Sequence, residues 1–180
     1  MRARIIEAPK GFSVAGPRSA YVYYGKLADN KVKDISATSE KPMEVEISVL
    51  SYDGNGEANA ELIEKVYQKL NAEDFRPMGD LISVHSCEII EFAIDLRVIF
   101  KASNVVDKQS IIAEIKSNLQ DYVDAEHRIG GVIALSGIYA KSYIDFVEEI
   151  IILSPAENIK CSLHQAPYCT DINVEEYGVE

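Results

Sequence analysis

A run of alternating apolar and polar residues, Met43 to Leu50, constrains the fold more than any other stretch. Its apolar members recur at every second position: Met43, Val45, Ile47 and Val49. A period of two places these side chains on one face of a β-strand. An apolar sheet face has to be covered by other elements, so the run predicts a layered fold rather than an isolated hairpin.

Further elements are expected around this strand in the first half of the chain. Pro17 can open a helix that carries Ala20, Tyr21, Tyr24 and Leu27. A second strand is predicted over residues 32–38, and Pro42 marks an antiparallel connection between the two strands. After the turn at residues 53–56, Asn59 is a suitable N-cap for a helix over residues 60–71. A strand over residues 81–86 completes this half.

The second half repeats the same kinds of element with a different sequence. Residues 89–100 alternate as a long amphipathic strand, and residues 107–127 have helical spacing. Gly130 and Gly131 are expected to end that helix. A short helix and three strands should follow, over residues 135–143, 146–153, 159–162 and 170–174. The pattern predicts an α+β fold of two consecutive small α/β sandwich units with short mixed or antiparallel sheets, over residues 1–88 and 89–180.

Charge and composition exclude several functional classes. The chain has 180 residues with 18 Lys and Arg against 29 Asp and Glu, a formal net charge of −11. This acidic balance argues against nucleic acid as a partner. The longest apolar run, residues 150–153, is far too short to span a membrane, and residues 1–9 do not form a signal peptide. The three cysteines, Cys87, Cys161 and Cys169, lack paired spacing and predict reduced thiols in a cytosolic product.

Two weak metal patterns are present, and neither predicts a site. The segment from Asp53 to Glu64 spaces its oxygen ligands as a calcium loop does, but Ala58 stands where the sharp turn needs glycine. Its acidic residues fit the first turns of a helix equally simply. Cys161, His164 and Cys169 form a small group of soft ligands that only a composite site with His85 and Cys87 could complete. We therefore expect no metal and no cofactor.

No local motif supports catalysis. A cysteine nucleophile would have to pair with His85, His127 or His164, and Ser136-Gly137 lacks the preceding glycine of a nucleophile elbow. No catalytic, cofactor-binding or metal-binding residue is predicted. The tyrosines at positions 21, 23 and 24 fit two interpretations, an anchor at a protein interface or a helix stripe packed on the core.

Several motifs in order resemble one protein family. Residues 7–17 carry the stretch APKGFSVAGP, and Val32 to Ile35 read VKDI. Val45 to Leu50 is followed by Asp53-Gly54, then Arg76 to Asp80 reads RPMGD, and Ala166 to Thr170 reads APYCT. These stretches resemble baseplate J-like proteins of contractile-tailed phages and related injection machines. Met78-Gly79 departs from the family's usual Leu-Thr pair.

The resemblance implies a structural role without catalysis. Proteins of this kind act as wedges that surround the tail hub and join into a ring, so the implied partners are other baseplate wedge and tail proteins. The implied location is the bacterial host cytoplasm during assembly and then the tail baseplate of the virion. Family members are generally longer, and the resemblance covers their middle and C-terminal parts. We expect the isolated chain to be a monomer or a weak homodimer formed through residues 89–180, because the net charge makes identical chains repel.

Two other classes stay open from the residues alone. A two-layer α+β unit can also serve as a small-ligand-binding regulatory domain, and an enzyme with a Cys/His site is a further alternative. A ligand or active site should present a concave pocket with convergent polar groups. A wedge protein should instead present a broad apolar patch.

Overall fold

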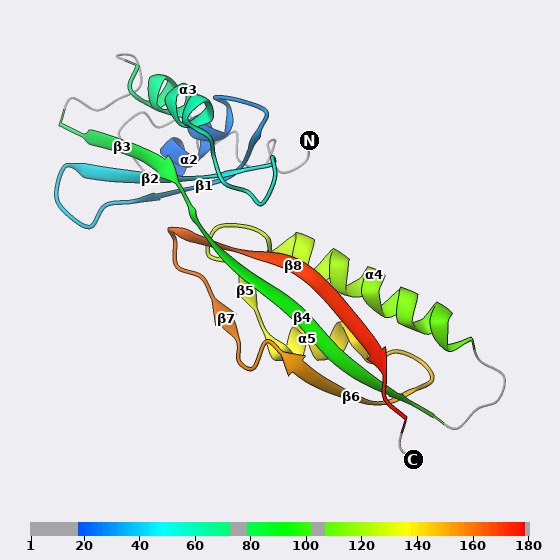
Figure 1. Ribbon diagram of the computed structural model, residues 1–180. Helices are drawn as coiled ribbons and strands as arrows, with labels where there is room; N and C mark the ends of the chain where they lie inside the picture. The colour runs from blue at the N-terminus through cyan, green and yellow to red at the C-terminus, as the bar shows by residue number, and fades with distance from the viewer. Residues whose placement is uncertain (1–17, 73–78, 102–106, 179–180) are drawn as a thin grey trace. The chain divides into compact units, whose positions relative to one another are not determined.

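The computed structural model describes residues 18–72, 79–101 and 107–178, and the chain divides into two compact units. Unit 1 runs up to Ile89 and takes in two later pieces, Arg128–Gly130 and Ser162–Ala166, here called the return segments. Unit 2 comprises Ile90–His127, Gly131–Cys161 and the chain from Pro167 onward. The described residues form helices and small mixed sheets, which confirms the α+β class (Figure 1).

Unit 1 is a three-stranded sheet with two helices. Its elements are α2 (Arg18–Lys26), β1 (Val32–Thr38), β2 (Glu44–Ser51), α3 (Ala60–Leu70) and β3 (Leu81–Ser86). The strand order is β1-β2-β3, with β1 and β2 antiparallel and β2 and β3 parallel. A parallel pair needs a crossover connection, and α3 supplies it. The predicted strands over residues 32–38 and 81–86 are confirmed with the same bounds.

Local chemistry sets the start of α3. The Asn59 side chain accepts a hydrogen bond from the Leu62 backbone N–H at 2.9 Å, as expected for an N-cap. Leu62, Val66 and Leu70 then recur at helical spacing and are all buried. The helix therefore turns one apolar stripe toward the sheet.

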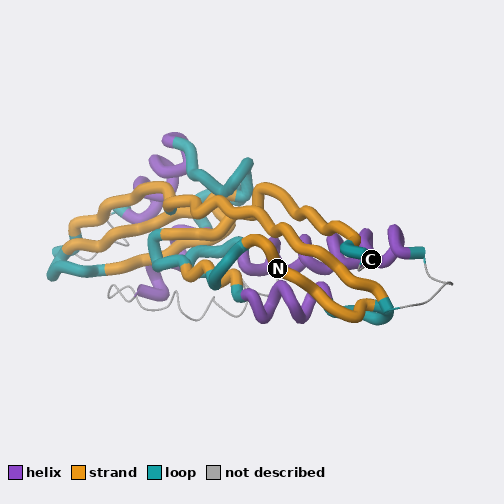
Figure 2. Tube along the Cα trace, turned by 60° about the horizontal axis from the view of Figure 1, so that its bottom comes forward, coloured by secondary structure: helices purple, strands orange, loops and turns teal. Residues whose placement is uncertain are grey.

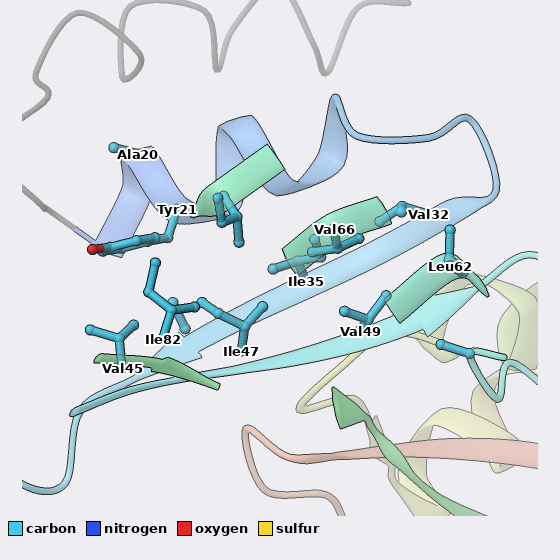
Figure 3. Packing of buried hydrophobic residues seen from close by; sticks show 13 residues of the cluster. Ala20, Tyr21, Val32, Ile35, Val45, Ile47, Val49, Leu62, Val66 and Ile82 are labelled. Carbon is cyan, nitrogen blue, oxygen red and sulfur yellow. The ribbon is translucent and has the colours of Figure 1, made fainter. Parts of the chain in front are cut away.

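The alternation in β2 explains the core of unit 1. Val45, Ile47 and Val49 are buried and point toward the helices, where they meet Leu62 and Val66 of α3 (Figure 3). Ile35 of β1 joins the same cluster. Because neighbouring residues of a strand point to opposite faces, Ser48 and Leu50 lie on the second face of this sheet.

Unit 2 is built around one long strand. Its elements are β4 (Glu88–Phe100), α4 (Lys108–Glu126), β5 (Val132–Ile133), α5 (Leu135–Ser142), β6 (Val147–Ser154), β7 (Ile159–Lys160) and β8 (Gln165–Glu176). β4 and β8 begin in residues that belong to unit 1. The main sheet has the order β6-β4-β8, and β5 pairs with β7 (Figure 1). Figure 2 distinguishes the strands from the helices by colour along the chain trace.

The central strand β4 has an antiparallel neighbour on one side and a parallel neighbour on the other. β6 pairs with it in antiparallel fashion. On the other side, the Thr170 hydroxyl donates to the Phe92 carbonyl at 3.0 Å and the Tyr177 N–H donates to the Val98 carbonyl at 2.9 Å. These bonds advance together along both strands, so β8 is parallel to β4 (Figure 1). The sheet is therefore mixed.

One face of this sheet carries the core of unit 2. Ile94, Leu96 and Val98 are fully buried in one cluster with Ile115 and Leu119 of α4. The opposite residues of β4 are only half-buried. The helices α4 and α5 contribute to this single core, so the apolar burial of unit 2 lies on one side of its sheet.

Three details differ from the sequence expectation. The helix α4 ends at Glu126 with His127 as its C-cap, several residues before the glycines that were expected to end it. Gly130 instead supplies a positive φ of 72° to the first return segment. The two-residue strand β5 was not predicted because so short a strand has no period, and β8 extends well beyond residues 170–174 on both sides.

Candidate interaction surfaces

The calcium-like segment is occupied by ordinary helix and turn contacts. The Lys31 amine donates to Asp53 at 2.7 Å, Asn59 caps α3, and Glu61 pairs with Lys65 at 2.8 Å. The hydrogen bond between Glu61 and Lys65 lowers the pKa of the Glu61 carboxyl and raises the pKa of the Lys65 amine. Across residues 18–72, 79–101 and 107–178, no group of three or more His, Cys, Asp or Glu side chains is arranged to hold a metal ion.

The cysteine and histidine side chains that the sequence offered as possible metal ligands belong to different units. Cys161 and Cys169 belong to unit 2, whereas His85, Cys87 and His164 belong to unit 1. None of the three cysteines, all of which lie in the described ranges, forms a disulfide. Burial raises the pKa of the Cys169 thiol, which donates to the Asp171 carbonyl at 3.3 Å. A thiol with a raised pKa is a poorer nucleophile at neutral pH.

Two of these candidates do meet, around a residue that the sequence analysis missed. His85 Nε2 lies 3.1 Å from Ser48 Oγ, and His164 Nδ1 lies 3.0 Å from the same oxygen. Thr38 Oγ1 is 3.4 Å from the other ring nitrogen of His164. Ser48 is 0% exposed. In the sequence Ser48 only occupies a polar position of the alternating run, between Ile47 and Val49, so it gave no local signal for this cluster.

The chemistry of this Ser48 cluster is structural. A serine hydroxyl can donate to one imidazole and accept from a second, so Ser48 satisfies both histidines at once. Because the hydroxyl is fully buried, no substrate atom reaches it. The arrangement joins β2, β3 and the second return segment rather than preparing a nucleophile.

Other hydrogen bonds fix both return segments on the second face of the unit 1 sheet. The Ser36 hydroxyl donates to the Leu163 carbonyl, and the Ile129 N–H donates to Asp34 at 3.1 Å. The Glu88 N–H donates to the His164 carbonyl at 2.8 Å. A small apolar cluster lies among these bonds: Leu50, Cys87, Ile129 and Ala166. Both faces of this sheet are therefore covered around Ser48.

The tyrosines near the start of the described chain divide between the two interpretations. Tyr21 is 1% exposed and donates to Asp80 at 2.6 Å, so it is a core residue with a satisfied hydroxyl. Tyr23 and Tyr24 are half-buried and pack edge to face with ring centroids 5.3 Å apart.

Two of the family motifs lie wholly or partly outside the described residues. These are residues 7–17, which include the predicted helix start at Pro17, and the first part of the second motif, Arg76–Met78.

The sheet of unit 2 presents a different second face, here called the open face. β4 contributes Asp95, Arg97 and Ile99, and β6 contributes Glu149, Ile151 and Leu153. β8 contributes Asn173 and Glu175, and Tyr177 follows directly after that strand. Leu153 and Tyr177 are each 43% exposed. A hollow of about 490 Å³ lies at the end where Ile99, Glu149 and Tyr177 meet Lys108 and Glu176.

The two units differ sharply in charge. Unit 2 contains six Lys and Arg against fifteen Asp and Glu, a formal net charge of −9. Unit 1 contains twelve against fourteen, a formal net charge of −2. Most of the net negative charge of the chain thus belongs to unit 2, which carries the open face.

The sequence is 39% identical over 177 residues to Baseplate protein J of Escherichia phage P2, a match that covers 98% of this chain and 58% of that protein. The resemblance that the motifs indicated is therefore confirmed. The chain spans somewhat more than half the length of this curated relative. No family model matches the chain.

A solved structure gives an independent comparison of the fold. The chain superposes with a TM-score of 0.63 and 10% sequence identity on a chain of the cryo-EM structure of the anti-feeding prophage baseplate, 6-fold symmetrised. The match covers 94% of this chain and 41% of that one. At this identity the likeness concerns the fold. Among the described helices, none combines the length and apolar character required to cross a membrane.

Proposed function

We propose that this chain is a structural component of a contractile-tail baseplate, of the baseplate J type. The observation that carries the proposal is the 39% identity to Baseplate protein J of phage P2 across almost the whole chain. The fold shared with a chain of a solved prophage baseplate supports it. The role needs protein surfaces rather than a reacting group.

The proposal includes partners and a course of action. The chain binds other baseplate wedge and tail proteins and takes part in forming the ring around the tail hub. It assembles in the host cytoplasm and remains in the baseplate of the virion. Rearrangement of the ring at a host surface would switch packed interfaces between two arrangements, which requires no catalytic step. In isolation the chain is a monomer or weak dimer, and residues 89–180 supply the contact.

Deleting the coding region of residues 1–180 from its own genome tests the proposal. Tails are purified from the deletion strain and examined by negative-stain electron microscopy, with a plasmid-borne copy as the control. We expect tails without complete baseplates, and baseplates restored by the plasmid. Complete baseplates in the deletion strain would contradict the proposal. A small-ligand-binding role would leave baseplate morphology unchanged.

A further inference from the structure

The open face of unit 2 has apolar side chains that no described element covers. Ile99 and Ile151 on this face are half-buried, and Leu153 and Tyr177 on the same face are 43% exposed. A sheet face that only meets water ordinarily carries polar side chains at such positions. In unit 1 the corresponding face is covered by the return segments. This contrast indicates that the open face of unit 2 is built to be covered.

The charges on the open face specify what can cover it. Three carboxylates, Asp95, Glu149 and Glu175, stand against one guanidinium, Arg97. Arg97 lies over the Tyr177 ring at 5.2 Å from its centroid, and Asn173 donates to both Asp95 and Glu175 at 3.2 Å. Within the described residues, no ion pair reaches Glu149. The face therefore offers an apolar centre with an excess of negative charge.

The hollow at the end of the open face also combines apolar surface with an excess of carboxylates. Glu148, Glu149 and Glu176 line it together with Phe100 and Lys108. Lys108 pairs with Glu176, and its amine lies 5.6 Å from the centroid of the Phe100 ring. The hollow thus already holds one ammonium group between a carboxylate and an aromatic ring, and its other two carboxylates can receive further cations.

A second copy of this chain is a poor occupant for the open face. Each unit 2 has a formal net charge of −9, so two such faces would repel before their apolar centres could meet. A basic partner would instead be attracted over the Debye length and would neutralise the unpaired carboxylates. Charge therefore selects a different protein.

We propose that the open face of unit 2 is the docking surface for a neighbouring protein that presents Lys or Arg side chains around an apolar patch. This inference rests on the proposed function, because it assigns a surface and a partner chemistry to that role. Ile151, Leu153 and Tyr177 supply the apolar contact. Glu149 and Glu175 receive the cations, and the stacked Arg97 is held ready for a carboxylate or carbonyl of the partner.

Charge reversal on and off the open face tests the inference. The full chain is immobilised, and the purified products of the tail genes flanking its own are passed over it separately. The test variant is Glu149→Lys with Glu175→Lys. The matched control is Glu114→Lys with Asp121→Lys, which makes the same charge change at exposed positions of α4. We expect the test variant to bind at least one product about 10-fold or more weakly and the control to bind nearly as the parent does.

Two leucine substitutions and binding measurements at different salt concentrations complete the experiment. Leu153→Ser removes an exposed leucine from the open face, and Leu163→Ser removes one of similar exposure, 46%, from a return segment. Only Leu153→Ser should weaken binding. Binding by the parent chain should also weaken between about 0.01 M and about 1 M salt, as screening shortens from roughly 30 Å to roughly 3 Å.

The possible failures are distinguishable. If the parent chain binds none of the flanking tail proteins, the proposed function fails along with the inference. If the parent binds one of them and the open-face variants bind equally well, only the inference is overturned. Equal losses in the test and control pairs would show a non-specific charge effect and overturn it as well. Self-association blocked by the open-face variants would identify a second copy as the occupant, against the inference.

Discussion

The two three-stranded sheets in the described part of the chain differ in the exposure of their second faces. Each has three strands with helices packed against one face. In unit 1 the second face is closed around Ser48 by the return segments, and His164 of the second segment shares the buried Ser48 hydroxyl with His85. In unit 2 the second face keeps Leu153 and Tyr177 in contact with solvent and carries Glu149, which forms no ion pair among the described residues.

This difference separates a structural role from a binding role. A covered face with fully satisfied polar groups stabilises its unit and offers little to a partner. An open face with apolar and acidic side chains gains most when another protein covers it. We therefore assign stability mainly to the second face of unit 1 and partner binding mainly to the second face of unit 2.

Removing the return segments should have the largest effect. A fragment of residues 1–89 keeps every strand of the unit 1 sheet but uncovers Leu50, Cys87 and Ser48. We expect it to melt about 10 °C or more below the full chain by circular dichroism and to bind a hydrophobic dye. A chain ending at Tyr177 retains both segments and serves as the control. A fragment that melts at the full-chain temperature would refute the closed-face assignment.

A matched pair of truncations on the two second faces should give the next largest effect. Leu50 is 0% exposed in unit 1, whereas Ile151 on the open face is half-buried. Leu50→Ala should lower the free energy of unfolding in urea by about 2–5 kcal/mol, and Ile151→Ala by about 1 kcal/mol or less. Equal losses would mean that the open face contributes to stability as a core does.

Removing the Ser48 hydroxyl should lower the free energy of unfolding by a moderate amount. Ser48→Ala removes the hydroxyl shared by His85 and His164, so we expect a loss of about 1–3 kcal/mol in the free energy of unfolding. Ser83→Ala, at an exposed position of β3, is the matched control and should change stability very little. Faster hydrogen exchange at the His164 amide in the Ser48 variant would locate the loss in the return segment. Unchanged exchange there would contradict the role given to Ser48.

The smallest expected effect depends on pH and lies outside both second faces. Asp29 accepts hydrogen bonds from the Lys31 backbone N–H and the Lys65 amine, which lower the pKa of its carboxyl from 3.8. A lowered pKa in the folded chain stabilises it above pH 3.8, and this contribution is lost as the pH falls through the folded value. Asp29→Asn should therefore melt slightly lower than the parent at neutral pH and converge with it in acid. A difference that persists in acid would show a cause other than ionisation.

The sequence was sufficient for elements with a strong local signal. The alternation in β2 and the Asn59 cap with its apolar stripe each predicted an element to within a residue or two. Period and capping depend on neighbouring residues, so a single sequence records them directly. The family resemblance was readable for a related reason, since its motifs are short and contiguous.

The rest depended on contacts between residues far apart in the chain. Nothing near Ser48 indicates that His164, 116 positions later, will share its hydroxyl with His85. The open face was equally hidden, because an amphipathic strand such as β4 shows that one face is buried without showing what covers the other. The division of charge between the units also required knowing which unit holds each segment.

The return segments also impose an order in time. Unit 1 includes residues up to Ala166, near the end of the 180-residue chain. A ribosome adds residues at roughly 5–20 per second and allows contiguous domains to fold as they emerge. Here the first half is made early and must keep Leu50 and Cys87 uncovered until the second half has been synthesised. Unit 1, whose sheet is translated before unit 2, is thus completed only after most of unit 2 has been synthesised.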